Sequence, residues 1–156
     1  MKVDDLMVKT VAFCSPEDNL AQLASLFWKH RCGALPVIDD EGTVVGMITD
    51  RDACIALGTR NMPASQVKVR DVSAPRFFSC APEDELRRAL HTMASQEVRR
   101  LPVVDESGKL KGILSIDDVI LNAKAGSNID FTEVVTTLQA INSHRGHERT
   151  EVACTV

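Results

Sequence analysis

The pattern of hydrophobic and polar positions occurs twice along this chain, with the same order of predicted strands and helices each time. A short apolar run comes first, at residues 11–14 and again at residues 77–80, and each run predicts a strand. Apolar residues at helical spacing come next; they are Leu20, Leu23, Ala24 and Phe27, then Leu86, Ala89, Leu90 and Met93. The letters SPED and APED put a proline and acids where a first helical turn favours them. We therefore expect these helices to begin at Pro16 and Pro82.

The second half of each copy predicts a hairpin and another helix. The apolar runs ALPVID and RLPVVD are separated from VVGMI and LKGIL by the turn letters DEG and ESG. In the first copy, a helix is expected from Thr49 through Leu57. In the second copy, it is expected from Ser115 through Ala123. Each copy is thus a strand, helix, strand, strand, helix unit, and the fold class is mixed α/β (α+β).

The two copies align without a gap at an offset of 66 residues. The identical positions are Lys2, Val3, Asp5, Cys14, Pro16, Glu17, Asp18, Leu20, Leu35, Pro36, Val37, Asp39, Gly42, Gly46 and Asp52, each with its counterpart 66 residues later. Such self-similarity indicates two supersecondary units that pack together, here with pseudo-twofold symmetry. We place the first unit at residues 1–61 and the second at residues 62–126. In the segment GTRNMPASQ between them, Gly58 and Pro63 are the expected breakers.

Residues 127–156 lie outside the repeat. Asp130 is a candidate cap for an amphipathic helix whose apolar face is formed by Phe131, Val134, Val135, Leu138 and Ile141. This helix can extend a subunit interface or fold back on its own copy. From Ser143 onward the sequence is polar, and we expect a mobile tail.

Composition excludes several classes of protein. The chain has 156 residues, of which 44% are apolar, and a net charge of −4. A core can therefore form, whereas a dedicated nucleic-acid binder would be basic. No apolar run approaches the roughly 18 residues of a membrane span. The N-terminus MKVDDLMVKT has no apolar core like that of a signal peptide, so we expect a cytoplasmic protein without membrane or nucleic-acid partners.

Cysteine and histidine positions give no sign of a metal site. The five cysteines contain no CxxC spacing, so neither a zinc site nor a disulfide framework is expected. Cys14 and Cys80 occupy matching apolar stretches and are interpreted as small buried residues. His144 and His147 lie in a polar tail without further ligands. The chain also lacks a Walker loop, GxSxG, HExxH and GxGxxG, so we do not expect an enzyme.

Residues 1 to about 124 resemble a tandem pair of CBS domains, also called a Bateman module. The resemblance rests on HRCGALPVIDDEGTVVGMITDRD in the first copy and EVRRLPVVDESGKLKGILSIDD in the second. It implies a regulatory module of the stand-alone bacterial type that binds adenosine-containing ligands in clefts between the copies. It also implies a homodimer that signals to a protein partner by conformational change.

The resemblance assigns ribose binding to a Ser/Thr-x-x-Asp element, which is Thr49 and Asp52 in the first copy and Ser115 and Asp118 in the second. A carboxylate can accept from both ribose hydroxyls at once, which suits this role. The same spacing is also that of a helix capping box. Cap and site are compatible, because the cap positions the aspartate.

In the nucleotide-binding gamma subunit of AMP-activated protein kinase, basic residues before the apolar strand contact phosphate. The matching residues here are His30, Arg31, Arg99 and Arg100, and Arg51 within TDRD is a weaker candidate. Ala34 stands where the second copy has Arg100, and Gln96 and Glu97 stand where the first has His30 and Arg31. The two sites are therefore expected to differ in phosphate affinity, and one can remain empty.

The ligand class stays open at this point. AMP, ADP and ATP are the leading ligands, while NAD(H) and S-adenosylmethionine share the adenosine part. For the adenine slot, the candidates are Val11, Pro36, Phe77 and Pro102. The alternative function is a dimerisation or docking module for a partner enzyme that needs no nucleotide.

Overall fold

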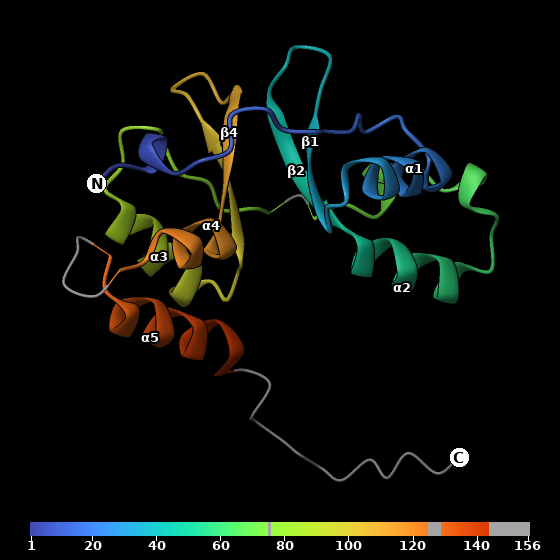
Figure 1. Cartoon of the computed structure of the whole chain (residues 1–156). Helices are drawn as coiled ribbons and strands as arrows, with labels where there is room; N and C mark the ends of the chain where they lie inside the picture. The colour runs from blue at the N-terminus through green and yellow to red at the C-terminus, as the bar shows by residue number, and fades with distance from the viewer. Residues whose placement is uncertain (75, 125–128, 144–156) are drawn as a thin grey trace, which may run out of the picture.

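The computed structural model describes residues 1–74, 76–124 and 129–143. Within them, each copy contains one antiparallel hairpin, and the two hairpins stand next to each other in the centre of the molecule (Figure 1). Helices flank them on both sides. The first half comprises α1 (Leu20–His30), β1 (Ala34–Ile38), β2 (Val44–Thr49) and α2 (Asp50–Arg60). The second half comprises α3 (Leu86–Ser95), β3 (Arg100–Val104), β4 (Leu110–Ser115), α4 (Ile116–Asn122) and α5 (Phe131–Asn142). The mixed α/β fold class is confirmed.

Both hairpins form with a glycine in the turn, as predicted, and an aspartate that precedes each turn accepts hydrogen bonds from its backbone. Oδ1 of Asp39 accepts hydrogen bonds from the backbone N–H groups of Glu41 and Thr43, at 3.0 and 2.8 Å. Gly42 and its counterpart Gly108 have φ of 84° and 78°, a left-handed conformation that favours glycine. The N–H of Val44 also donates to the carbonyl of Gly108 at 3.0 Å, so the hairpin of one copy contacts that of the other.

The prediction of a first strand in each copy, at residues 11–14 and 77–80, is wrong. Each run is reduced to a single parallel bridge, Cys14 to Val37 and Cys80 to Val103. The N–H of Cys14 donates to the Pro36 carbonyl at 3.1 Å, and that of Ile38 donates to the Cys14 carbonyl at 2.9 Å. In each run only the cysteine is buried beside the hairpin, and Phe13 next to Cys14 is 55% exposed, so the run does not extend along the hairpin as a strand.

The expected helix starts at Pro16 and Pro82 are also wrong. In SPED, the Asp18 carboxylate accepts from the N–H of Ser15 at 2.8 Å, which closes a separate turn before the helix. Helix α1 instead begins at Leu20, after an Asn19 cap, and α3 begins at Leu86. The prolines and acids therefore belong to a turn that local helix signals did not distinguish.

Helix α2 continues through Gly58, which was expected to end it. The helix stops at Arg60, and Asn61 follows with a left-handed φ of 50°. Asparagine tolerates this conformation better than most residues, so it takes the role commonly filled by glycine. Helix α4 ends at Asn122, one residue before its predicted end.

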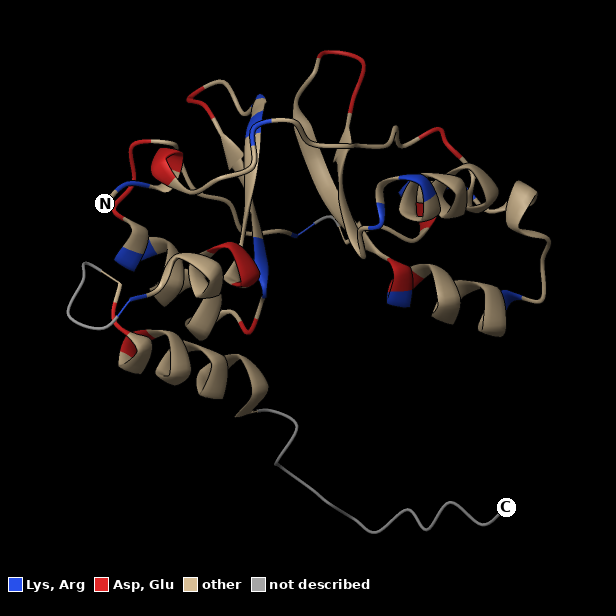
Figure 2. Cartoon of the chain, in the orientation of Figure 1, with Lys and Arg blue, Asp and Glu red and all other residues tan. Residues whose placement is uncertain are grey.

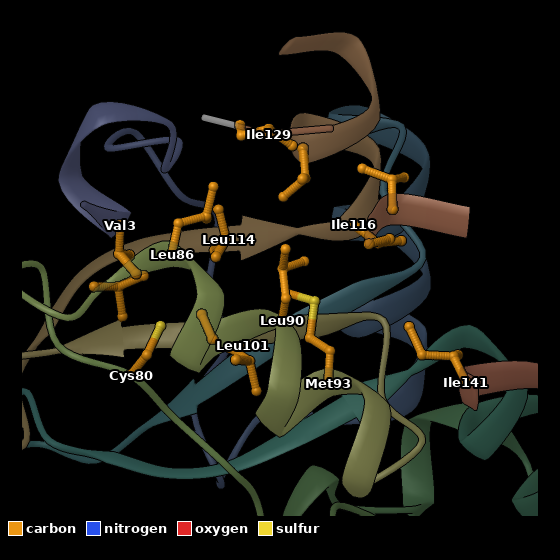
Figure 3. Packing of buried hydrophobic residues seen from close by; sticks show 14 residues of the cluster. Val3, Cys80, Leu86, Leu90, Met93, Leu101, Leu114, Ile116, Ile129 and Ile141 are labelled. Atoms are coloured by element: carbon orange, nitrogen blue, oxygen red, sulfur yellow. The ribbon is translucent and has the colours of Figure 1, made fainter. Parts of the chain in front are cut away.

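The two copies exchange their N-terminal segments, so that each segment is buried in the hydrophobic core of the other half. Val3 is fully buried in the core of the second half (Figure 3). Leu6 and Met7 from the same segment pack against this core. In the corresponding place, Val67 and Val69 are buried in the core of the first half. The units that pack together therefore differ from the units that repeat in the sequence. The exchange ties the two halves together.

Helix α5 folds back on α3 and α4 of its own half. Val134, Thr137 and Ile141 are buried, whereas Phe131 and Val135 each remain 52% exposed. The predicted apolar face is thus only partly used. Asp130 precedes the helix but makes no side-chain cap, contrary to expectation. The predicted mobile tail, with His144 and His147, lies outside the described residues from position 144 onward.

Cys14 and Cys80 are buried in the two cores, as predicted, with 1% and 7% exposure. Burial raises the pKa of each thiol to about 12, and a nearby aspartate adds to the effect. Among residues 1–74, 76–124 and 129–143, no three His, Cys, Asp or Glu side chains are grouped so that they could hold a metal ion. No described helix is both long and apolar enough to cross a membrane.

Candidate nucleotide-binding clefts

The Thr/Ser-x-x-Asp elements form capping boxes at the junction between a strand and a helix. Asp52 N–H donates to Oγ1 of Thr49 at 3.1 Å, while Oδ2 of Asp52 accepts from the backbone N–H and the hydroxyl of Thr49 at 2.9 and 2.7 Å. Ser115 and Asp118 reproduce this geometry, with distances of 3.2, 2.9 and 2.6 Å. The capping interpretation is therefore confirmed for both copies.

Each cap leaves one carboxylate oxygen available. Within the part of the chain that the structure describes, Oδ1 of Asp52 and Oδ1 of Asp118 accept no hydrogen bond. Both aspartates are half-buried and lie in the first turn of a helix, next to backbone N–H groups. The cap fixes each side chain and leaves an acceptor for a hydroxyl group.

A first cleft, which we call cleft A, lies between the two copies next to Asp52. It has a volume of about 420 Å³. Its described lining residues are Ala34, Met47, Thr49, Arg51, Asp52, Ala74, Arg76, Phe77, Phe78, Glu97, Val98, Arg99, Arg100, Ile141 and Asn142. This volume falls in the range typical of small-molecule sites.

A second cleft, cleft B, lies next to Asp118 and has a similar volume of about 430 Å³. Its described lining residues are Val8, Thr10, Val11, Ala12, His30, Arg31, Cys32, Ala34, Leu35, Arg100, Ile113, Ser115, Asp117 and Asp118. Most of these positions are related to those of cleft A by the 66-residue offset. The two clefts are therefore repeats of each other.

Each cleft combines the cap of one copy with the basic positions of the other. Cleft A joins Asp52 to Arg99 and Arg100, and cleft B joins Asp118 to His30 and Arg31. Within the hairpins, Arg100 pairs with Ser115 and Ala34 pairs with Thr49, which places each residue beside the cap of its own copy. Ala34 and Arg100 also line the cleft next to the other copy's cap, so both residues belong to both clefts. Figure 2 shows Lys and Arg positions at the start of β3 and in the first turn of α2.

The segments that cross between the halves close the clefts. Ala74 bridges to Met47 on β2, and Val8 bridges to Ile113 on β4. Figure 1 shows the N-terminal segment running from β4 across to β1. Sequence reasoning missed the contributions of Arg76 and Phe78 on the second crossing segment. The available signal was their place, since Arg76 directly precedes the apolar run predicted at residues 77–80 and Phe78 lies within that run.

The charges of the clefts differ strongly. Cleft A contains Arg51 and Arg76 in addition to Arg99 and Arg100, and neither of the first two forms an ion pair within the described residues. Cleft B has Asp117 at the position equivalent to Arg51. Nη2 of Arg100 lies 3.9 Å from Oδ2 of Asp117, so a carboxylate of cleft B already faces this shared arginine. Positive charge is therefore concentrated in cleft A.

Cys32 adds a further difference, because Val98 takes its place in cleft A. Partial burial raises the pKa of the Cys32 thiol, while backbone hydrogen bonding and the Arg100 charge act in the opposite direction. Cleft B is thus lined by a neutral thiol beside its carboxylates.

The structure gathers most of the predicted site residues in the clefts. Those in cleft A are Thr49, Arg51, Asp52, Phe77, Arg99 and Arg100, and those in cleft B are Val11, His30, Arg31, Arg100, Ser115 and Asp118. Pro36 and Pro102, the other two candidates for the adenine slot, are not brought into either cleft. Both are buried within their strands, and their carbonyls accept from Cys14 and Cys80.

Comparison with known proteins identifies this architecture. The family model described as the CBS domain matches residues 3–58 and 69–124, which together are most of the chain. The chain belongs to the CBS domain family. Its similarity to YlbB of Bacillus subtilis (strain 168) is 35% identity over 138 residues, covering 85% of this chain and 92% of YlbB.

Solved CBS domain structures share the fold. The CBS domain pair of protein MJ0100, crystallised with 5′-methylthioadenosine and S-adenosyl-L-methionine, has a TM-score of 0.71 at 20% identity, over 78% of this chain and 94% of that one. CBSX2 in complex with AMP has a TM-score of 0.68 at 28% identity, over 78% of this chain and 94% of CBSX2. The family match ends at residue 124, so α5 lies outside it.

Proposed function

We propose that this CBS domain pair is a regulatory sensor that binds an adenine nucleotide in cleft A. The proposal rests on one observation: the Asp52 carboxylate, held in place by its capping box, lines the same cleft as a group of arginines from the other copy. In this proposal, Oδ1 of Asp52 accepts from the ribose hydroxyls, and Thr49 assists. AMP, ADP and ATP are the leading ligands.

The remaining groups of cleft A suit the other parts of a nucleotide. Arg51, Arg76, Arg99 and Arg100 supply positive charge, and guanidinium groups bind phosphate through paired N–H donors. Met47, Phe77 and Val98 provide an apolar wall for a flat base. The complex of CBSX2 with AMP supports the choice of ligand class.

Cleft B is proposed as the weaker site for phosphate. Asp117 and Asp118 oppose an anion there, while Arg31 and the shared Arg100 remain as cations. NAD(H) and S-adenosylmethionine share the adenosine part and are the alternative ligands. The sulfonium of the latter tolerates carboxylates better than a phosphate does.

A calorimetric titration of nucleotide-stripped protein with AMP, ADP, ATP, NAD and S-adenosylmethionine tests the proposal. Saturable binding of a phosphate-bearing adenine nucleotide supports it. A folded protein that binds none of them contradicts it. No turnover of the bound nucleotide is expected, because the proposed role is regulatory.

Exposed apolar side chains favour a second role, as a homodimer or docking module. Ile55 on α2 and Leu121 on α4 are equivalent by the repeat and are 51% and 83% exposed. Trp28 on α1 is 88% exposed, so it is not part of either core. We propose that α2 and α4 form a homodimer interface, through which nucleotide binding changes the arrangement read by a protein partner. Sedimentation of the protein at a monomer mass would exclude the homodimer.

A further inference from the structure

Helix α5 contributes to cleft A although it lies outside both CBS repeats. Ile141 and Asn142, at its C-terminal end, line cleft A. Among the described residues that line cleft B, none comes from α5. The helix therefore distinguishes two clefts that the repeat makes otherwise equivalent.

The side-chain oxygen of Asn142 accepts a hydrogen bond from Arg99 of cleft A. Nδ2 of Asn142 donates to the carbonyl of Leu138 at 2.7 Å, one helical turn earlier. A carbonyl can only accept, so this bond fixes which end of the amide faces away from the helix. That end is Oδ1, which accepts from Nη2 of Arg99 at 3.4 Å. A guanidinium has five N–H donors, so other donors of Arg99 stay available for an anion.

The position of Asn142 does not depend on Arg99. Ile141 is 2% exposed and Val134 is 4% exposed, and both belong to the core of the second half (Figure 3). At the other end of the helix, Nε of Arg87 lies 3.3 Å from Oε1 of Glu133. The packed helix thus provides a fixed support for an exposed arginine. The first copy has Gly33 in place of Arg99 and needs no such support.

We propose that Asn142 is a positioning residue of cleft A, which holds the Arg99 guanidinium for the phosphate of a nucleotide, and that phosphate binding in turn stabilises the docked end of α5. This inference rests on the proposed nucleotide site in cleft A. A long side chain that is ordered in advance loses less conformational entropy on binding. Because coupling is reciprocal, phosphate must favour the docked helix by the same factor.

Titrations with ADP and adenosine test the positioning role. The variant Asn142→Ala is expected to bind ADP about fivefold more weakly, as for loss of a modest hydrogen-bond contribution. Adenosine affinity should be unchanged, since it has no phosphate for Arg99. The exposed Gln139→Ala on the same helix is the matched control and should behave as wild type. Asn142→Asp, a second variant, should also weaken ADP selectively, because its carboxylate competes with phosphate.

Hydrogen exchange gives an independent readout of the coupling. In wild type, ADP should slow exchange of the amides at the C-terminal end of α5 more than adenosine does, and Asn142→Ala should remove this difference. Unchanged or tighter ADP binding in Asn142→Ala overturns the inference and leaves the nucleotide site intact. Equal weakening of ADP and adenosine also overturns it, because it indicates a purely structural role. If folded wild-type protein binds neither ADP and adenosine nor AMP, ATP, NAD or S-adenosylmethionine, the proposed function is overturned together with this inference.

Discussion

Cleft A and cleft B have the same scaffold and nearly equal volumes, but different charges. Both have a capped aspartate and a crossing segment. At one equivalent pair of positions, Arg51 in cleft A is replaced by Asp117 in cleft B. At another, Glu97 of cleft A corresponds to Arg31 of cleft B. Cleft A additionally receives Asn142 from a helix outside the repeat.

This difference indicates that the repeat determines where each cleft lies but does not determine which ligand it binds. The capping box needs only Thr or Ser and Asp, so both copies form it. Phosphate affinity depends on charges at positions that the fold leaves free to vary. Because the scaffold is shared, a substitution in one cleft has a matched control at the equivalent position of the other.

Replacement of Asp52 by Asn should weaken ADP binding about 30-fold, which corresponds to about 2 kcal/mol of lost charge-assisted hydrogen bonding. Asp118→Asn is the matched change in cleft B and should leave the high-affinity binding of ADP unchanged. Calorimetric titration of both variants measures the effect. A larger loss of ADP affinity in Asp118→Asn than in Asp52→Asn would mean that the nucleotide binds in cleft B, which contradicts the proposal.

Replacement of Gly112 by Ala should destabilise the protein by about 2 kcal/mol, because overpacking strains the backbone. An added Cβ would lie 2.8 Å from the Val8 carbonyl oxygen, on the segment that closes cleft B. Gly46→Ala should cost less, because its nearest atom, the Ala74 oxygen, is 3.0 Å away.

Urea denaturation measures both changes in the free energy of unfolding. Gly58→Ala is the control, because nothing lies within 4 Å of its added Cβ and alanine favours a helix. This control should raise stability by up to about 1 kcal/mol. An undisturbed Gly112→Ala variant would mean that the crossing segment is not packed against β4 as described.

Arg51 in cleft A and Asp117 in cleft B occupy equivalent positions, and exchanging their charges should move phosphate affinity from cleft A to cleft B. Arg51→Asp is expected to weaken ADP binding about tenfold, as for one lost arginine–phosphate contact. Asp117→Arg should strengthen ADP binding to cleft B, since it adds a cation and removes the carboxylate that faces Arg100. The stoichiometry and affinity of ADP binding report both effects. Identical titrations for the two variants would show that charge at this position does not distinguish the clefts.

Alkaline pH should destabilise both halves through Cys14 and Cys80. Burial raises the pKa of each thiol to about 12 in the folded protein, from an ordinary value of 9.0. The stabilising contribution is therefore complete below pH 9 and is lost progressively as pH rises toward 12. Each thiol should cost about 1 kcal/mol at pH 10.

The slope of unfolding free energy against pH, measured from pH 8 to 10.5, checks this effect. A Cys14→Ala/Cys80→Ala variant starts from lower stability but should have a shallower slope. Equal slopes would mean that these thiols ionise as readily in the folded protein as in the unfolded chain.

The hairpins, the capped aspartates and the repeat could be predicted, because each depends on residues close together in the sequence. The helix starts could not, since Pro16 fits a first helical turn as well as the turn closed by Asp18. The sequence also did not predict that Val3 and Val67 are each buried in the core of the other half. This burial depends on tertiary packing that an apolar residue does not encode locally.

The site was predictable residue by residue, but its assembly was not. Asp52 and Arg99 were each identified from the motif, yet the packing of one copy against the other decides that they share a cleft. Arg76 and Asn142 were missed, because one belongs to a crossing segment and the other to a helix outside the repeat.

Chemical-shift perturbation by ADP shows which cleft binds the nucleotide. In a ¹H–¹⁵N NMR titration, we expect shifts at the amides of Thr49, Arg51 and residues 76–78, with little change at Val11, residues 30–32 and Ser115. Arg100 lines both clefts and is left out. Shifts concentrated at Ser115 and residues 30–32, or equal shifts in both clefts, would contradict the assignment of the nucleotide to cleft A.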